Sequence, residues 1–429
     1  MFGALLSKRT FLPLFICQFL SALNDNFIKN ALVILVLYRV GAENGGLMVT
    51  LAGATLIAPF FFLSALGGEL ADKYDKARVA RVIKVCEIPI AALAAYGFLT
   101  ASTPVLFAAL FGFGCMAALF GPLKYGILPD HLATEELSAA NALVEGATFL
   151  AILGGTILGG IAMLRVDGEP LIPLAAVSVV IIVLATLGFL SARLIPPTGN
   201  AQPELPITRN PLASTFRLIG ELRADRTLWR GAMITSMFWF AGIVALALLP
   251  TLVKTDLGGS EDVVTAGLCV FVVGIAVGSW AAAGAAHGKP NLALAPFGAL
   301  GMGLFSMMIA GVVAVLPDVQ TTVLRDVAMI AQSQSGMMIA VGLFGLAASG
   351  GLLVVPVFAA VQAWSPVDRR ARTIAGVNIL NAAFMTGGSL GLAGLQVAGF
   401  GSAILFALLG TLMLATAALI PRREAAWAS

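Results

Sequence analysis

Long runs without a single charged residue decide what this chain can fold into. The longest covers residues 373–421, which is 49 residues of uncharged sequence. About 20 apolar residues suffice to cross the ~30 Å hydrocarbon core of a bilayer. Within lipid every backbone N–H and C=O group needs a protein partner, and a helix provides these partners inside one segment. The runs therefore predict an all-α bundle of membrane-spanning helices.

Nine uncharged runs and one interrupted span give twelve predicted helices. The runs cover residues 44–68, 88–123, 146–164, 170–192, 231–253, 263–286, 290–317, 327–367 and 373–421. Two of these runs, 88–123 and 373–421, are expected to hold two helices each, with breaks at 100–104 and near 399–401, because Gly, Pro and Ser interrupt helices. The first span begins near Phe11, and its apolar character is interrupted at residues 24–26. Three Gly-x-x-x-Gly patterns, at 155–159, 274–278 and 387–391, predict closely packed helix pairs.

The composition excludes several classes of protein. Hydrophobic residues make up 59% of the chain and charged residues 11%, whereas soluble proteins carry about 25% charged residues. A net charge of +3 is too small for a nucleic-acid binder. The sequence has no phosphate-binding loop. The two histidines, His131 and His287, have no Cys or carboxylate at metal-ligand spacing.

We therefore predict no catalytic residues, no metal site and no cofactor. The four cysteines lie within apolar stretches, where they are typical of small core residues; they are Cys17, Cys86, Cys115 and Cys269. A protein of this kind is expected to move a substrate rather than to transform one.

The distribution of Lys and Arg predicts the orientation. With the N-terminus in the cytoplasm, eighteen of the 25 basic residues fall in cytoplasmic segments, as the positive-inside rule requires. These residues are Lys8, Arg9, Lys73, Lys76, Arg78, Arg81, Arg193, Arg209, Arg217, Arg223, Arg226, Arg230, Lys289, Arg369, Arg370, Arg372, Arg422 and Arg423. The outer loops hold only Arg39, Arg165, Lys254 and Arg325. Both termini are therefore expected to be cytoplasmic.

One polar, proline- and arginine-rich stretch divides the chain. It covers residues 195–228 and follows the sixth predicted span. We expect a six-helix bundle at 1–194, a cytoplasmic linker at 195–228 and a second six-helix bundle at 229–429. This layout resembles the major facilitator superfamily, whose members alternate access to a site at the bilayer midplane.

The loop after the second span carries a motif of that superfamily. Gly68, Asp72 and Arg78 match the pattern of a glycine, an acid four residues later and then basic residues. The resemblance implies a conformational switch in which Asp72 contacts the other half of the protein. Its expected partners lie just before span 11; they are Arg369, Arg370 and Arg372. Ordinary solvated positive charges remain the alternative interpretation of these arginines.

Charged residues within the spans are candidates for function, because each costs about 2.5–3.5 kcal/mol to insert. Asp25 lies near the middle of span 1, and Lys29 follows four residues later on the same face. A structural Asp25–Lys29 pair is the alternative to a substrate site. Lys84 and Glu87, in span 3, are expected to form an intrahelical pair. Lys124 in span 4 and Glu145 in span 5 could form a further gate or structural pair.

The second half lacks such charges. Pro122 and Pro356 align as a weak internal repeat. In this alignment Phe358 is at the position equivalent to Lys124, and Asn378 and Asn381 are near the positions equivalent to Asn141 and Glu145. One wall of the transport path would thus be charged and the other apolar. The expected apolar wall, some of whose members could instead face lipid, comprises Phe238, Trp239, Phe240, Phe344 and Phe358. Such asymmetry suits a substrate with a charged head and a long apolar tail.

Short motifs narrow the resemblance to the bacterial lysophospholipid transporters of this superfamily. They are Cys17-Gln-Phe-Leu-Ser-Ala22 with Asp25-Asn26, Lys124-Tyr-Gly-Ile-Leu128, Asn141-Ala-Leu-x-Glu145 with Ala151-Ile-Leu-Gly154, Ser236-x-Phe-Trp239, and Val355-Pro356. Asn24 replaces a glycine, Lys29 is additional and the 366–376 connection is longer than in the family.

This resemblance implies inward flipping of lysophospholipids, chiefly lysophosphatidylethanolamine, across the bacterial inner membrane for reacylation. A lysophospholipid acyltransferase/acyl-carrier-protein synthetase is the implied partner. Candidate head-group residues are Asp25, Asn26, Lys29, Lys124, Tyr125, Asn141 and Glu145, with Asp25 facing the ammonium and Lys29 or Lys124 the phosphate. Two alternatives remain open: a proton-coupled multidrug or small-molecule antiporter, and a non-transporting membrane partner of an acyltransferase.

Overall fold

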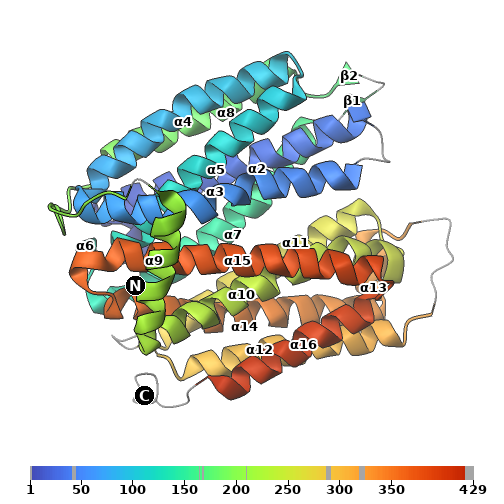
Figure 1. Cartoon of the computed structure of the whole chain (residues 1–429). Helices are drawn as coiled ribbons and strands as arrows, with labels where there is room; N and C mark the ends of the chain where they lie inside the picture. Colours follow the sequence, from blue (N-terminus) through green and yellow to red (C-terminus); the bar gives the residue numbers. More distant parts are fainter. Residues whose placement is uncertain are drawn as a thin grey trace. The chain divides into compact units, whose positions relative to one another are not determined.

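The computed structural model describes residues 2–40, 45–163, 165–166, 169–208, 210–286, 291–317 and 324–420. Some residues of the orientation and metal-site predictions lie outside these ranges; they are Arg209, His287, Lys289, Arg422 and Arg423. Almost all of the described chain is helical (Figure 1). A two-stranded antiparallel ribbon, β1 (Arg165–Val166) and β2 (Glu169–Pro170), precedes α8.

Twelve of the described helices are long enough to cross a membrane. Over their described residues, ten of them also have the length and apolar composition of a span; the other two, α2 and α15, are 29 and 28 residues long. The twelve are α2 (Leu12–Val40), α3 (Gly45–Lys73), α4 (Lys76–Leu99), α5 (Thr103–Gly126), α7 (Leu137–Ala162), α8 (Leu174–Arg193), α10 (Arg226–Thr251), α11 (Glu261–Gly284), α12 (Leu294–Ala314), α14 (Gln334–Trp364), α15 (Arg370–Val397) and α16 (Ser402–Leu419). The predicted all-α fold is therefore confirmed.

Shorter elements connect these helices. They are α1 (Phe2–Leu6), α6 (Leu128–His131), η2 (Thr134–Glu136), α9 (Pro211–Ala224), the π-helical turn η3 (Leu252–Asp256), α13 (Val327–Gln332) and η4 (Val367–Arg369). The helix α9 lies inside the stretch that the sequence predicted only as a linker.

Both predicted breaks are present. Between α4 and α5 the chain turns at Ala101, whose φ of 48° is in the left-handed region. Between α15 and α16 it turns at Gly399 with a φ of 86°, where glycine has no Cβ penalty. The helix α2, in contrast, continues without a break through residues 24–26.

The chain forms two compact units that do not coincide with the two halves of the sequence. Unit 1 contains residues 1–133, 147–224 and 364–379, and unit 2 contains residues 134–146, 225–363 and 380–429. The first part of α7 therefore belongs to unit 2, and the first part of α15 belongs to unit 1. The two helices occupy equivalent places in the halves, as spans 5 and 11.

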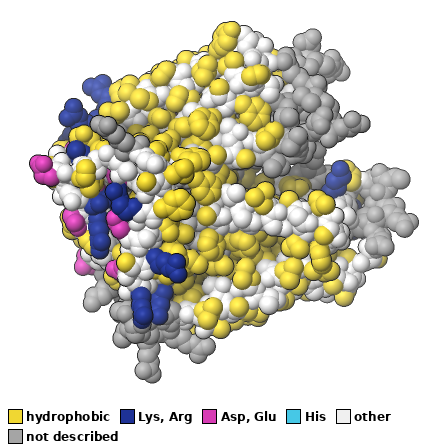
Figure 2. Space-filling model, in the orientation of Figure 1, with side chains coloured by type: hydrophobic (Ala, Val, Ile, Leu, Met, Phe, Trp, Pro, Cys, Tyr) yellow, Lys and Arg dark blue, Asp and Glu magenta, His cyan; other side chains and the backbone are white. Residues whose placement is uncertain are grey.

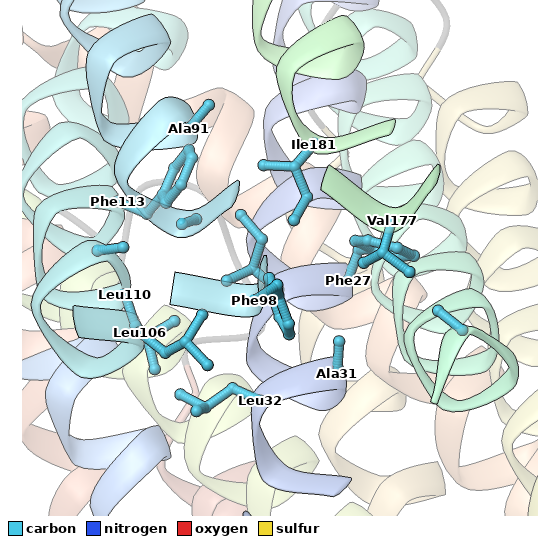
Figure 3. Close-up of a cluster of buried hydrophobic side chains, with 14 of the residues drawn as sticks. Phe27, Ala31, Leu32, Ala91, Phe98, Leu106, Leu110, Phe113, Val177 and Ile181 are labelled. Carbon is cyan, nitrogen blue, oxygen red and sulfur yellow. The ribbon is translucent and has the colours of Figure 1, made fainter. Parts of the chain in front are cut away.

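Unit 1 has a core of apolar side chains between α2, α4, α5 and α8 (Figure 3). Phe27, Phe98 and Phe113 fill the larger spaces. Small residues let the backbones approach each other: a Cβ added at Gly155 or Gly159 of α7 would lie 2.6 Å from a backbone oxygen of α2. The first glycine motif therefore packs one helix against another, as predicted.

Unit 2 uses the second glycine motif in the same way. An added Cβ at Gly274 of α11 would lie 2.5 Å from the Phe344 oxygen of α14. Gly278 packs against the same helix at Ala348. The third motif was predicted wrongly, because a Cβ at Gly387 or Gly391 would meet no described atom within 4 Å. It is the neighbouring Gly388 that faces another helix, because a Cβ added there would lie 2.8 Å from the Phe240 ring of α10.

The linker helix α9 packs crosswise on α3 within unit 1 (Figure 1). Its Leu218 lies in a small apolar cluster with Ala65 of α3 and with Ala375 and Ile379 of α15. The cluster helps to explain why this polar stretch of sequence orders into a helix, because Leu218 is buried against three apolar partners.

Candidate functional site

Three consecutive polar residues in the middle of α2, Asn24, Asp25 and Asn26, point in three different directions. Asn24 donates to the Ile181 oxygen of α8 at 3.2 Å. Asn26 donates to the Ala22 oxygen of its own helix and packs against Gly155 of α7. Successive residues of a helix point about 100° apart, which separates their directions. Asn24 and Asn26 thus lie at helix contacts, and Asp25 lies between their two directions.

Asp25 makes no hydrogen bond or ion pair within the described part of the chain, and it is partly accessible. Its carboxylate lies within electrostatic range of Lys84, Glu87, Lys124 and Lys29. The alternative of an Asp25–Lys29 ion pair does not describe this structure, because Lys29 Nζ donates instead to Asn26 Oδ1 at 3.0 Å. Asp25 is thus a carboxylate close to cations but not bonded to one of them.

Lys84 and Glu87 form the predicted intrahelical ion pair in α4, and both are buried. Sequence reasoning missed the other groups around the ammonium. Lys84 Nζ donates to Ser21 Oγ of α2 at 2.6 Å and lies 4.0 Å from the centre of the Phe120 ring. A buried ion pair needs such additional partners to offset its desolvation. A serine on a neighbouring helix gives no sequence signal that would reveal this contact.

Lys124 and Tyr125 lie at the end of α5. Lys124 is partly accessible, and its Nζ lies 4.6 Å from the centre of the Tyr125 ring, while Tyr125 itself is buried. Asn378 of α15 approaches this end of α5, because a Cβ at Gly121 would meet its Nδ2 at 3.0 Å. All these residues belong to unit 1.

The predicted head-group residues of α7 belong to unit 2. Asn141 and Gln362 of α14 form a reciprocal amide pair, with Nδ2 donating to Gln362 Oε1 at 2.6 Å and Gln362 Nε2 donating to Asn141 Oδ1 at 3.2 Å. Both side chains are fully buried. Glu145 is also buried. Asn141 thus already has a protein partner that satisfies its amide.

The predicted apolar wall divides into buried and accessible side chains. Phe238 is buried against Gly350 and Ile275, and its ring meets that of Trp239 edge-on at 5.4 Å. Phe358 is also buried, whereas Trp239 and Phe344 are partly accessible. One turn before Trp239, Ser236 donates to Asn381 Oδ1 at 2.9 Å.

The last turns of α3, which carry Gly68 and Asp72 of the signature motif, bind the start of α15. The sequence predicted a loop at these residues, but the helix continues to Lys73. Asp72 accepts hydrogen bonds from the backbone N–H groups of Ala371 and Arg372, at 2.9 and 3.0 Å, and from Arg372 Nε at 3.1 Å. A carboxylate at this position caps the helix and complements its dipole. Gly68 allows the approach, because an added Cβ would lie 2.9 Å from Arg372 Cα.

The other predicted switch residues have separate positions. Arg370 pairs with Asp130 at 2.8 Å, and the same carboxylate pairs with Lys76 at 2.9 Å. Arg369 makes no ion pair among the described residues, and Arg78 donates its backbone N–H to Asp75 Oδ1. Of the three arginines expected at Asp72, the structure brings only Arg372 to it.

The linker is hydrogen-bonded to the end of α3, at Glu69, and to the turn that follows it, at Asp75. Asp75 accepts from the backbone N–H groups of Thr198 and Gly199 at 2.7 and 2.8 Å. Burial alone would raise the pKa of Asp75, but these hydrogen bonds and that from Arg78 hold the pKa below its ordinary value. Glu69, which is fully buried, binds Ser214 Oγ at 2.5 Å and Arg217 Nη2 at 2.6 Å of α9.

Comparison with protein families decides the class of the protein. The profile of the Major Facilitator Superfamily matches residues 14–338. The chain belongs to the major facilitator superfamily. Membership confirms the predictions of a transporter rather than an enzyme and of the fold of this superfamily.

The narrower resemblance is confirmed by relatives named lysophospholipid transporter LplT. The chain is 30% identical to that of Serratia proteamaculans over 285 residues, covering 65% of this chain and 66% of the relative. It is 34% identical to that of an Enterobacter species, covering 62% and 64%, and 32% identical to that of Cronobacter sakazakii, covering 66% and 67%. The similarity thus spans about two thirds of each relative.

Solved structures share the fold at low sequence identity. The human organic anion transporter MFSD10 has a TM-score of 0.75 at 16% identity, with 96% of this chain and 99% of the other covered. The transporter FucP in its outward conformation has a TM-score of 0.70 at 11% identity, with 97% and 100% covered. At these identities the likeness concerns the fold alone.

Proposed function

We propose that the protein flips lysophospholipids, chiefly lysophosphatidylethanolamine, from the outer to the inner leaflet of the bacterial inner membrane. The observation that carries the proposal is the unbonded Asp25 carboxylate, with lysines nearby. An ethanolamine ammonium supplies the cation that Asp25 lacks, and Lys124 or Lys29 supplies a cation for the phosphate. The relatives of this chain, named for lysophospholipid transport, support the same substrate class.

The acyl tail is proposed to lie along the accessible aromatic residues Trp239 and Phe344. Their partly exposed rings offer apolar surface without a hydrogen-bonding demand. The buried Phe238, whose ring meets that of Trp239, supports this surface in the proposal. Two six-helix halves, 1–194 and 229–429, would alternate access as in other transporters with repeated halves.

The product of inward flipping is a lysolipid on the cytoplasmic side. We propose that a lysophospholipid acyltransferase/acyl-carrier-protein synthetase reacylates it there, and that both termini of the transporter are cytoplasmic. The excess of Lys and Arg in the segments assigned to that side supports the orientation.

Proteoliposomes containing the full chain and labelled lysophosphatidylethanolamine test the proposal. The variant Asp25→Asn should lower the flipping rate about tenfold or more, because a hydrogen bond to a charged group contributes about 1.5–3 kcal/mol. Glu135→Gln removes one exposed carboxylate outside the proposed site and should leave the rate unchanged. Wild-type flipping by Asp25→Asn would remove Asp25 from the mechanism.

A head-group panel sharpens the same test. Lysophosphatidylglycerol has no ammonium, so Asp25→Asn should reduce its flipping much less than that of lysophosphatidylethanolamine. An equal loss for both lysolipids would contradict direct contact between Asp25 and the head group.

An unbonded carboxylate in a span also suits a proton-coupled antiporter, which is the second candidate. In that case a protonophore would abolish transport, and lysolipids would not compete with the transported drug. Flipping of lysolipid without an imposed proton gradient would decide for the first proposal.

A further inference from the structure

The linker helix α9 packs against α3 at Phe61 and Ala65, which are two to three turns before the end of α3 at Lys73. Thr215 donates its hydroxyl to the Phe61 oxygen of α3 at 2.8 Å, and Leu218 packs on Ala65. At 1.5 Å per residue, Ala65 lies roughly 12 Å from the end of α3 at Lys73. The polar headgroup region of one leaflet is only about 5–8 Å thick. The middle of α9 is therefore expected near the boundary between headgroups and acyl chains.

The face of α9 that points away from unit 1 is mainly apolar. Leu212 is 49% exposed and Phe216 is 74% exposed, and residues four apart lie one above the other on a helix. The other residues exposed on this helix are Pro211, Ala213, Arg217, Gly220, Arg223 and Ala224. The acid of this helix, Glu221, has a side chain that is 38% exposed and lies 3.8 Å from Arg217 at the edge of this face. At about 100° per residue it points away from Leu212, Phe216 and Arg223. Figure 2 shows dark-blue Lys and Arg side chains, with some magenta Asp and Glu side chains among them, at the left of the view, the end at which Figure 1 draws α9.

The opposite face of α9 is already satisfied by protein. Ser214 and Arg217 bind Glu69, and Leu222 packs on Gly376 of α15. These contacts fix which side of the helix points outward, so Leu212 and Phe216 cannot turn inward without breaking them. A large exposed phenyl ring held at this depth requires an apolar neighbour, and the surrounding lipid supplies it.

We propose that α9 is an interfacial helix that binds anionic phospholipids of the inner leaflet. Leu212 and Phe216 insert among the acyl chains, while Arg223, close to them on the same face, binds a lipid phosphate. The arginine stem runs along the apolar surface and its head reaches the phosphate. The surface goes beyond the proposed transport site, although its assignment to the inner leaflet rests on the proposed orientation.

The position of α9 gives this contact a consequence. The helix touches both α3 and the start of α15, the two elements that Asp72 joins. Lipid bound along α9 therefore stabilises the arrangement in which Asp72 caps α15. Anionic lipid is expected to favour this arrangement.

The depth of α9 can be measured on the full chain in liposomes. Phe216→Cys, in a background with Cys17, Cys86, Cys115 and Cys269 replaced, carries a bimane label. Phosphatidylcholine brominated in its acyl chains should quench this label strongly, and aqueous iodide only weakly. Glu204→Cys, an exposed position of the same linker, should show the reverse. Equal iodide quenching at both positions would overturn the interfacial position.

The lipid class is tested by adding phosphatidylglycerol to the same vesicles. Quenching of the label by the brominated lipid should rise with the mole fraction of phosphatidylglycerol. Arg223→Gln should raise the mole fraction of phosphatidylglycerol that gives half-maximal quenching by about fivefold. The same response to phosphatidylcholine as to phosphatidylglycerol would overturn the anionic preference. Neither measurement depends on transport, so failure here is distinguishable from failure of the proposed lysolipid activity.

Discussion

The helix pairs α2–α7 in unit 1 and α10–α15 in unit 2 occupy equivalent places in the two halves of the sequence, yet they differ in chemistry. Both pairs have hydrogen bonds between side chains of their two helices. In unit 1 these are Thr148 to Gln18 at 3.2 Å and Asn30 to Thr156 at 3.1 Å, and in unit 2 the bond is Ser236 to Asn381 at 2.9 Å. Only the unit 1 pair adds charges in the middle of a span, Asp25 and Lys29 of α2, and of these Lys29 already donates to Asn26. Because unit 2 holds its pair together without charge, helix packing does not explain Asp25. The charge is better explained by function.

The largest expected effect concerns the buried ion pair Lys84–Glu87 of unit 1, which has no counterpart among the described residues of unit 2. Lys84→Met leaves the Glu87 carboxylate buried without its cation, which should lower the free energy of unfolding by about 3–5 kcal/mol. The thermal unfolding midpoint of the detergent-solubilised protein measures the loss. Ser236→Ala, which removes only a neutral hydrogen bond in unit 2, should cost about 1 kcal/mol.

The double variant Lys84→Met/Glu87→Leu provides the control for this prediction. It removes both charges and should regain most of the lost stability. If the double variant unfolds as early as the single one, the damage comes from packing rather than from an unpaired charge.

A smaller effect is expected from glycine-to-alanine changes in the two helix pairs, at Gly155 of α7 and at Gly387 of α15. Gly155→Ala places a Cβ 2.6 Å from the Leu23 oxygen of α2, so the backbones must separate at a cost of about 1–3 kcal/mol. Gly387→Ala on α15 meets no described atom within 4 Å and should be neutral or slightly stabilising, because alanine favours helix. Chemical denaturation of the two variants checks this difference. Equal stability would show that α2 and α7 can shift without cost.

The smallest effect concerns Asp75, whose lowered pKa stabilises the attachment of the linker to unit 1. Its contribution is complete above the ordinary aspartate pKa of about 4 and is lost as the pH falls through the lower folded value. Limited proteolysis with pepsin should therefore cut near residues 198–199 increasingly below about pH 4. Asp75→Asn should show the faster cleavage already at pH 4. An unchanged cleavage pattern would contradict the role of Asp75.

The sequence predicted the elements of this fold far better than their partners. Uncharged runs located the spans, and glycine and proline located both breaks, because these signals are local. The helix α9 was not predicted, since it has only 14 residues and its apolar residues are interspersed with polar and charged ones. The Asn141–Gln362 pair escaped notice because 221 residues separate its members. Asp25 was recognisable as a candidate from its cost in lipid, whereas the serine and phenyl ring around Lys84 depend on tertiary structure.

The first part of α7 belongs to unit 2, most of which is translated much later. This arrangement has a consequence during synthesis. Asn141 emerges from the ribosome 221 residues before Gln362, and at about 5–20 residues per second this delay is roughly 10–40 seconds. Throughout that interval the nascent α7 holds an amide whose eventual partner has not been translated. The membrane-insertion machinery, water or a temporary neighbour must accommodate it, which makes this stage of biogenesis the one most sensitive to changes at Asn141.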